Sequence, residues 1–236
     1  MSDLHSINEA INKRAGRKLL PSILVSLLLL AAIFISIAYV PILFALLVGT
    51  AVMLATRELI AAFHARGIEV RFLHLSFATA ALIASSWLAG LSGLAISIVI
   101  SMIALLFIQL MKGIDGFVKN ATASLFALLY PGFVSGFIFL LARSENGFEY
   151  ITTLVILVGC NDTFAYLAGV AIGKHPLAAK ISPKKSWEGF IGGLIATTIG
   201  SSLAFYYLLD RHPYIGALAG FLGVLAATVE IGRAHV

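Results

Sequence analysis

Long apolar runs alternate with short polar segments along the whole chain. A run of about 18 or more apolar residues can cross a hydrocarbon core about 30 Å thick as a helix. The pattern predicts about eight such helices, with abutting ends at Pro41 and at Gly90–Gly93. The expected spans are 19–40, 41–63, 72–90, 91–111, 120–142, 150–173, 189–209 and 214–230. The fold class that follows is all-α, a polytopic transmembrane helical bundle.

Composition supports a membrane protein and excludes several other classes. Of 236 residues, 60% are hydrophobic and 11% are charged, too few charges to cover the surface of a water-soluble domain. The single cysteine, Cys160, excludes an internal disulfide and a cysteine-based zinc site. The sequence contains no glycine-rich P-loop motif. The net charge of +5 does not indicate nucleic acid, because the basic residues flank the predicted spans.

The distribution of basic residues predicts the orientation. Residues 1–18 form a polar tail that ends in a basic cluster, and the apolar run after it is too long for a signal-peptide core. Placing the N-terminus in the cytoplasm leaves only Arg143 and Arg211 in the outer segments. The inner segments then hold Lys13, Arg14, Arg17, Lys18, Arg66, Arg71, Lys112, Lys119, Lys174, Lys180, Lys184, Lys185 and Arg233. The positive-inside rule therefore predicts that residues 1–18 and 180–190 face the cytoplasm.

Small residues indicate where helices pack closely. Four glycine pairs have the spacing that lets helix backbones approach each other, and we interpret them as packing sites only. They are Gly132/Gly136, Gly169/Gly173, Gly189/Gly193 and Gly216/Gly220. Pro131, in the middle of the span at 120–142, is expected to kink that helix or to free a backbone carbonyl.

Asp162 lies near the middle of the span at 150–173. An ionised carboxylate at that depth costs about 2.5–3.5 kcal/mol, so it requires a partner, a metal ion or a water-filled cavity. Tyr166, four residues on, shares its helical face, and Asn161 is adjacent. A functional role is the default interpretation of such an acid. A protonated or lysine-paired Asp162 that joins helices remains the structural alternative.

Directly after this span comes a polar segment that ends in KISPKKSWEGF, residues 180–190. Ser182-Pro183 is typical of a helix N-cap followed by proline at the first helical position. A helix that begins there would point free N–H groups toward the neighbouring cations, which is the arrangement of a phosphate site. Those groups are Lys174, His175, Lys180, Lys184 and Lys185. Lysines that act only as topology signals are the alternative.

The stretch DTFAYLAGVAIGKHPLAAKISPKKSWEGFIGG, residues 162–193, resembles the phosphatidate cytidylyltransferase (CDP-diacylglycerol synthase) family. The resemblance implies a multispan enzyme of phospholipid biosynthesis that transfers CMP from CTP to phosphatidic acid and releases pyrophosphate, with Mg²⁺ as cofactor. It further implies membrane lipid as a partner, no nucleic acid, and the cell membrane as location, with the active face in the cytoplasm. It leaves a homodimer open.

The same resemblance assigns roles to residues. It places Asp162 in a polar cavity, in contact with metal or water, while Ser182 and Glu188 orient the polar segment. The implied catalytic residues are Asp162, Lys184, Lys185 and Glu188. The implied substrate-binding residues are Lys174, Lys180, Ser182 and Tyr166, with the lysines on phosphates of CTP or phosphatidate. The resemblance leaves the direct metal ligands unknown, with Asp162 as one candidate, and the main ones are expected in a C-terminal signature that this chain lacks.

Three other functions fit part of the pattern. A CTP-dependent polyprenol or phytol kinase has similar spans and basic loops, but it leaves CDP as product. An anion or lipid transporter could line a pathway with Asp162 and the basic segment, although the sequence shows no inverted repeat. A structural membrane scaffold would give the SPKKSWEG stretch no purpose.

The C-terminus carries a separate expectation. The last six residues, IGRAHV, match the translation of a common sequencing-adapter sequence. We therefore expect residues 231–236, together with Glu230, to be non-native. On this hypothesis residues 19–230 form an incomplete cytidylyltransferase-like transmembrane domain that is inactive alone. Genomic sequencing across codons 225–236 tests it.

Overall fold

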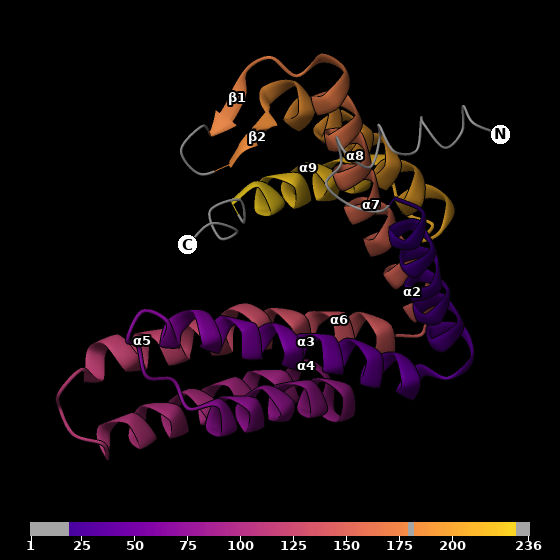
Figure 1. Cartoon of the computed structure of the whole chain (residues 1–236). Coiled ribbons are helices and arrows are strands. Elements are labelled where there is room, and N and C mark those ends of the chain that lie inside the picture. The colour runs from indigo at the N-terminus through magenta and orange to yellow at the C-terminus, as the bar shows by residue number, and fades with distance from the viewer. Residues whose placement is uncertain (1–18, 179–181, 230–236) are drawn as a thin grey trace. The chain divides into compact units, whose positions relative to one another are not determined.

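The computed structural model describes residues 19–178 and 182–229, which fold as two compact units (Figure 1). The first unit ends at Arg143 and the second begins at Ser144. The expectations for the tail at 1–18, for Lys180 and for Glu230 with residues 231–236 lie outside the described residues. Within them the chain is overwhelmingly helical, so the predicted all-α class is confirmed apart from one short β-hairpin.

The first unit consists of helices joined by short connections. They are α2 (Leu19–Tyr39), α3 (Pro41–His64), α4 (Phe72–Leu110), α5 (Phe117–Ala127), the π-helical turn η1 (Leu128–Phe133) and α6 (Val134–Arg143). Val40 separates α2 from α3, and Pro41 occupies the first turn of α3, where its missing N–H costs nothing. This confirms the boundary predicted at Pro41.

The long helix α4 is a hairpin of two antiparallel arms. A straight helix of 39 residues would extend about 58 Å, yet Gln109 Nε2 donates to the backbone oxygen of Glu69 at 3.4 Å. Ser85 and Ser97, one on each arm, are hydrogen-bonded at 2.7 Å. The reversal takes place at Gly90, whose φ of 67° and ψ of −150° are accessible essentially to glycine alone. The predicted boundary between the spans at 72–90 and 91–111 is therefore correct.

Helix α5, the turn η1 and α6 form one continuous apolar stretch, Phe117–Arg143, interrupted at Pro131. Proline has no N–H to donate, and a π-turn accommodates the missing hydrogen bond without breaking the helix. Pro131, expected to kink the helix or to free a backbone carbonyl, lies in a π-helical turn instead of regular α-helix. It falls where α5 and α6 pack against the other helices of the first unit.

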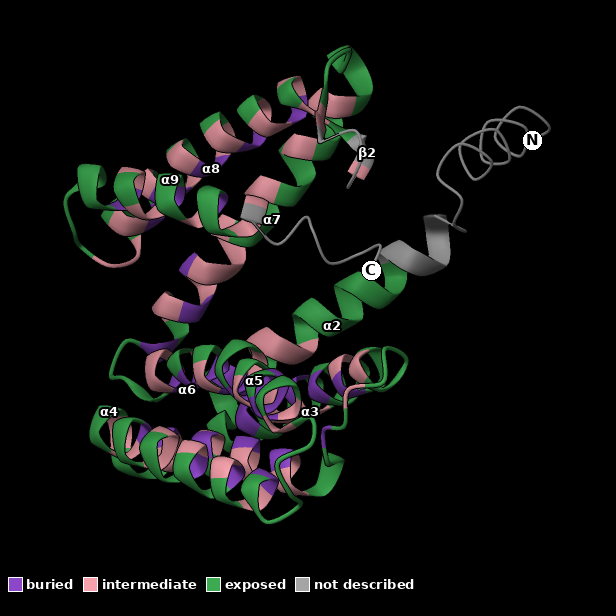
Figure 2. Ribbon diagram, turned by 90° about the vertical axis from the view of Figure 1, so that its left-hand side faces the viewer, coloured by how far each residue is buried: buried purple, intermediate pink, exposed green. Residues whose placement is uncertain are grey.

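The core of the first unit is built by residues from α3, α4 and α5–η1. Leu75, Leu82 and Leu94 are fully buried, and so are Ala127 and Leu128. Exposed residues cover the outer faces of these helices (Figure 2). Most of the exposed side chains on α4 are large and apolar, including Phe77, Leu88 and Ile103. Apolar outer faces of this kind are suited to lipid rather than to water.

The second unit contains α7 (Gly147–Ile172), β1 (Pro176–Ala178), β2 (Ser182–Ser186), α8 (Trp187–Tyr207) and α9 (Pro213–Val229). Helix α8 packs against both α7 and α9. All four predicted glycine pairs lie at close approaches, which confirms their packing role. In the second unit, a Cβ added to Gly193 would lie 3.0 Å from the Cβ of Ala165, and one added to Gly220 would lie 2.8 Å from the carbonyl oxygen of Thr197.

Five helical segments of the described chain are long and apolar enough to cross a membrane. They are Pro41–His64, Phe72–Leu110, Phe117–Arg143, Gly147–Ile172 and Trp187–Tyr207. Two shorter apolar helices, Leu24–Tyr39 and Pro213–Thr228, accompany them. The chain is therefore a helical membrane protein.

Candidate active site

The polar segment between α7 and α8 folds as a β-hairpin. Strand β1 pairs antiparallel with β2, with Pro176 opposite Ser186 and Ala178 opposite Ser182. The backbone N–H of Trp187 donates to the carbonyl of His175 at 2.9 Å and extends the ladder by one step. This pairing brings the end of α7 and the start of α8 together, so residues 13 apart in sequence become neighbours.

The hairpin corrects the helix start predicted at Ser182-Pro183. Both residues belong to β2, and α8 begins only at Trp187. Its N-cap is Ser186, whose Oγ accepts a hydrogen bond from the N–H of Gly189 at 3.1 Å. A proline fits in this short ribbon because each strand has one unpaired side, where no N–H is required. Strand pairing, rather than the local helix-start preference of Ser182-Pro183, therefore determines the structure of these residues.

Ser186 also fixes the hairpin against the end of α7. Its Oγ lies 3.3 Å from the position that a Cβ on Gly169 would take, and 2.6 Å from that of Gly173. A Cβ on Gly189 would meet the carbonyl oxygen of Ala165 at 2.7 Å. Only glycine allows the first turn of α8 to approach the last turns of α7 this closely. The glycines thereby set the position of the whole polar segment.

Glu188 joins the residue before β1 to the first turn of α8 through both carboxylate oxygens, at the same end of the hairpin as Ser186. Nδ1 of His175 donates to Oε1 at 2.6 Å, and the backbone N–H of His175 donates to Oε2 at 3.3 Å. The His175 side chain is 77% exposed, whereas that of Glu188 is 21% exposed. The role of Glu188 in orienting the segment stays a prediction. Sequence reasoning missed Ser186 and the pairing of His175 with Glu188; the S-W-E-G stretch, with a serine three residues before Gly189, was the one local signal for the cap.

Two lysines of the polar segment are exposed and accessible to a ligand. Lys174 and Lys185 are exposed, and neither has an ion-pair partner among the described residues. Lys184 lies in β2, and Lys180 falls outside the described residues. Two unpaired cations at the end of a membrane helix are suited to an anionic group such as phosphate.

Asp162 and Tyr166 form a separate polar pair on α7. Both are exposed and lie one turn apart on the same helical face, while Asn161 points toward Gly193 on α8. Asn161 Nδ2 donates to Asp162 Oδ1 at 3.3 Å, and the described residues provide no cationic partner for Asp162. The helix continues for ten residues beyond Asp162, about 15 Å, before the hairpin begins. The structure therefore does not bring Asp162 into contact with the lysine segment.

The described residues contain no cluster of three or more His, Cys, Asp or Glu side chains that could hold a metal ion. Mg²⁺ is usually held by one or two carboxylates together with substrate phosphates and water. Asp162, which is exposed and has no cationic partner in the described part of the chain, fits one such ligand but does not make a complete site.

The long apolar helices, with a polar hairpin between two of them, define an α-helical membrane protein. Residues 21–231 match the model of the cytidylyltransferase family, and the chain belongs to this family. This confirms the family predicted from the motif at residues 162–193.

Several relatives share part of the chain and are named phosphatidate cytidylyltransferase. The protein of Mycobacterium leprae is 40% identical over 95 residues, which cover 40% of this chain and 30% of that protein. The protein of Mycobacterium tuberculosis H37Rv is 40% identical over 90 residues, 38% of this chain and 27% of the relative. That of Staphylococcus aureus COL is 38% identical over 97 residues, 41% of this chain and 37% of the relative. The similarity thus spans about a third of each relative.

Proposed function

We propose that the protein transfers CMP from CTP to phosphatidic acid, giving CDP-diacylglycerol and pyrophosphate in phospholipid biosynthesis. Membership of the cytidylyltransferase family and the names of the relatives support this reaction. The structural observation that carries it is the polar segment after α7, in which Lys174 and Lys185 are exposed and have no ion-pair partner among the described residues. A membrane enzyme that joins a nucleotide to a lipid phosphate requires such a cationic element.

The proposed reaction requires side chains that position the substrates and neutralise phosphate charge, rather than side chains that accept a proton. A phosphate oxygen of phosphatidic acid attacks the α-phosphorus of CTP, the bond from that phosphorus to the bridging oxygen breaks, and pyrophosphate leaves. The attacking phosphate is already an anion near neutral pH, so a strong general base is not required. In reactions of this type positioning and charge neutralisation provide most of the rate enhancement. Lys174, Lys180, Lys184 and Lys185 are the cations we assign to the phosphates.

The remaining residues of the proposal have supporting roles. Ser186 and Glu188 keep the hairpin in place, and Ser182 lies at the start of β2. Mg²⁺, when bound, neutralises phosphate charge in such reactions, and Asp162 is the carboxylate we assign to it. Tyr166 shares the exposed face of Asp162 and is assigned to the same polar region.

The proposal includes a topology of about eight spans in the cell membrane, with the N-terminus and the hairpin in the cytoplasm. The reversal of α4 at Gly90, which makes its two arms antiparallel, supports counting Phe72–Leu110 as two spans. A membrane-impermeant thiol reagent tests the orientation in a Cys160→Ser background carrying Lys185→Cys. Labelling in inside-out vesicles but not in intact cells is expected, and the reverse pattern would contradict the topology. A homodimer is also part of this proposal, and mass measurement in detergent tests it.

The experiment that tests the function measures nucleotide binding and products together. The chain in lipid nanodiscs is titrated with CTP and Mg²⁺, and the double variant Lys174→Gln/Lys185→Gln is expected to bind about tenfold or more weakly. Arg66→Gln is the matched control, because it removes one exposed cation from the first unit. Equal binding by the double variant would contradict the assignment of the hairpin.

Product analysis separates the alternatives when phosphatidic acid or a polyprenol is added to the same preparation. The absence of any product is the result expected if residues 19–230 are an incomplete domain. CDP-diacylglycerol and pyrophosphate indicate the proposed transfer, whereas CDP and a phosphorylated polyprenol indicate a kinase. Movement of an anion across the membrane without a change in either substrate would indicate a transporter.

A further inference from the structure

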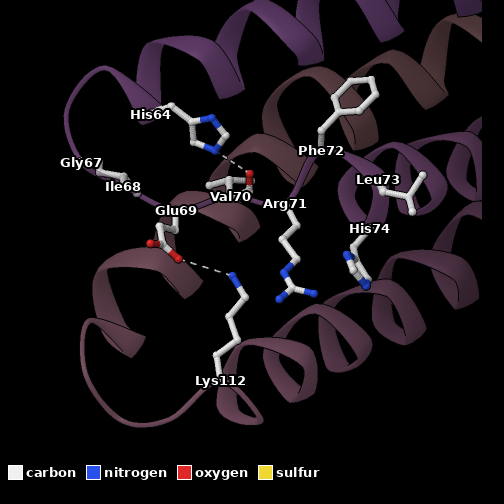
Figure 3. A pocket seen from close by; sticks show the side chains of 10 residues that line it. All are labelled: His64, Gly67, Ile68, Glu69, Val70, Arg71, Phe72, Leu73, His74 and Lys112. Atoms are coloured by element: carbon white, nitrogen blue, oxygen red, sulfur yellow. Dashed lines mark hydrogen bonds and ion pairs between the residues drawn. The ribbon is translucent and has the colours of Figure 1, made fainter.

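A second cationic site lies in the first unit, far from the hairpin in sequence. The end of α3, the connection to α4 and the first turn of α4 surround a recess with a volume of about 1010 Å³ (Figure 3). Arg71 and Lys112 extend into the same space, with the ring of His74 beside them (Figure 3). The function proposed above makes no use of this recess.

The charges in the recess are unbalanced. Glu69 is the one carboxylate among its lining residues, and its Oε2 lies 3.7 Å from Nζ of Lys112. The Glu69 side chain is 77% exposed, so this long ion pair is weak and easily exchanged. Arg71 has no ion-pair partner among the described residues. Two cations therefore face one carboxylate, and a single negative charge would neutralise the excess.

The Lys112 side chain is 24% exposed, although the residue as a whole lies in an open turn. Most of this side chain is covered by its neighbours, which holds its ammonium group at the recess. Nδ1 of His74 has less than 1 Å² of accessible surface, so a ligand in the recess does not reach it. An anion with several oxygen atoms is suited to bind Lys112 and Arg71 together.

The surroundings of the recess favour a lipid over a free anion. Phe72 and Leu73 line it and are 46% and 62% exposed, and Phe77, one turn further along α4, is 69% exposed. Apolar side chains thus continue from the cationic end of α4 along a helix long enough to cross a membrane. A phospholipid has the same polarity, with a phosphate at one end and acyl chains beyond it.

The connection that forms the recess is held in shape without Arg71 or Lys112. His64 Nε2 donates to the carbonyl of Val70 at 2.8 Å, and Lys119 Nζ donates to that of Gly67 at 3.1 Å. The backbone N–H of Glu69 donates to Asn120 at 2.9 Å. The side chain of Arg71 takes no part in these bonds, so it is free to serve a ligand.

We propose that this recess binds the phosphate of an anionic phospholipid, with Arg71 and Lys112 as the charged contacts. The shared chemistry is that of a phosphodiester or a free phosphate, and the apolar flank assigns it to the lipid. The site goes beyond the cytidylyl transfer proposed above and does not depend on it.

The test uses the whole chain in detergent and native mass spectrometry. Dioleoylphosphatidylglycerol is the probe, because its phosphodiester bears one negative charge and lacks the monoester phosphate of phosphatidic acid. The wild-type chain is expected to retain this lipid, whereas the zwitterion dioleoylphosphatidylcholine is not retained. Arg71→Gln/Lys112→Gln should weaken retention by about 25-fold, which is about fivefold for each basic residue at a lipid phosphate.

The control variants distinguish specific binding of the lipid in the recess from nonspecific attraction of anionic lipid to basic residues. Arg66→Gln removes an exposed cation of the same connection that does not line the recess, and it should leave retention unchanged within about twofold. If it weakens binding as much as the double variant does, or if the double variant binds like the wild type, the proposal is wrong. Should the double variant fail to fold, as judged by its elution profile and helical content, Arg71→Gln alone should still give about a fivefold loss. Displacement of the lipid by millimolar inorganic phosphate would overturn the lipid assignment in favour of a free phosphate.

Discussion

The close contact of α7 and α8 makes Gly189→Ala the most informative single substitution. The added methyl group would lie 2.7 Å from the carbonyl oxygen of Ala165, 3.1 Å from Oγ of Ser186 and 3.3 Å from Cα of Gly169. The first and third of these atoms belong to the backbone of α7, so no side-chain rotation relieves the contact. The two helices must move apart.

The size of the effect follows from two opposing terms. Overpacking at a tight contact costs about 1–3 kcal/mol. Replacing glycine by alanine inside a helix gains up to about 1 kcal/mol of propensity. We therefore expect Gly189→Ala to lower the free energy of unfolding of the second unit by about 1–2 kcal/mol. The backbone N–H of Gly189 is hydrogen-bonded to the cap residue Ser186. Separation of the two helices should therefore displace the hairpin and weaken CTP binding, although no lysine has changed.

Gly159→Ala in α7 is the matched control, because a Cβ there would have nothing within 4 Å. This variant should be neutral or stabilised by up to about 1 kcal/mol. The assay is reversible unfolding in mixed micelles, followed by far-ultraviolet circular dichroism, with CTP titration of both variants. If Gly189→Ala and Gly159→Ala unfold alike and bind CTP alike, the glycine contact does not position the hairpin.

Three further substitutions test separate elements. Ser186→Ala removes the N-cap of α8 and should lower the free energy of unfolding by about 1 kcal/mol in the same assay. Ser186→Thr should restore most of that free energy. An alanine variant as stable as the wild type would refute the capping role. Gly90→Ala places a side chain at a φ of 67° and a ψ of −150° and should destabilise the first unit by about 1–3 kcal/mol. Gly49→Ala is the control, because a Cβ there meets nothing within 4 Å, and it should not destabilise the unit. Equal free energies of unfolding for the two variants would show that the reversal tolerates a side chain. Asp162→Asn should leave unfolding unchanged and abolish the Mg²⁺ dependence of CTP binding, and a retained Mg²⁺ dependence would remove Asp162 from the metal site.

Much of the fold could be predicted because membrane insertion depends on local hydrophobicity. The boundary at Pro41, the reversal at Gly90 and the interruption at Pro131 were all visible in the sequence, since each depends on a backbone restriction of that residue. The family was visible too, because its motif is contiguous over residues 162–193.

What only the tertiary structure decided were contacts between residues distant in sequence. The pairing of His175 with Glu188 and the choice of Ser186 rather than Ser182 as the cap depend on the register of a hairpin. That register joins residues up to 13 apart in sequence, and no local signal specifies it.

The same reasoning applies to Arg71 and Lys112. They line one recess because α4 folds back on itself, although in sequence they appear only as basic residues between spans. Hydropathy determines which segments enter the membrane. Packing determines which polar groups meet at its surface.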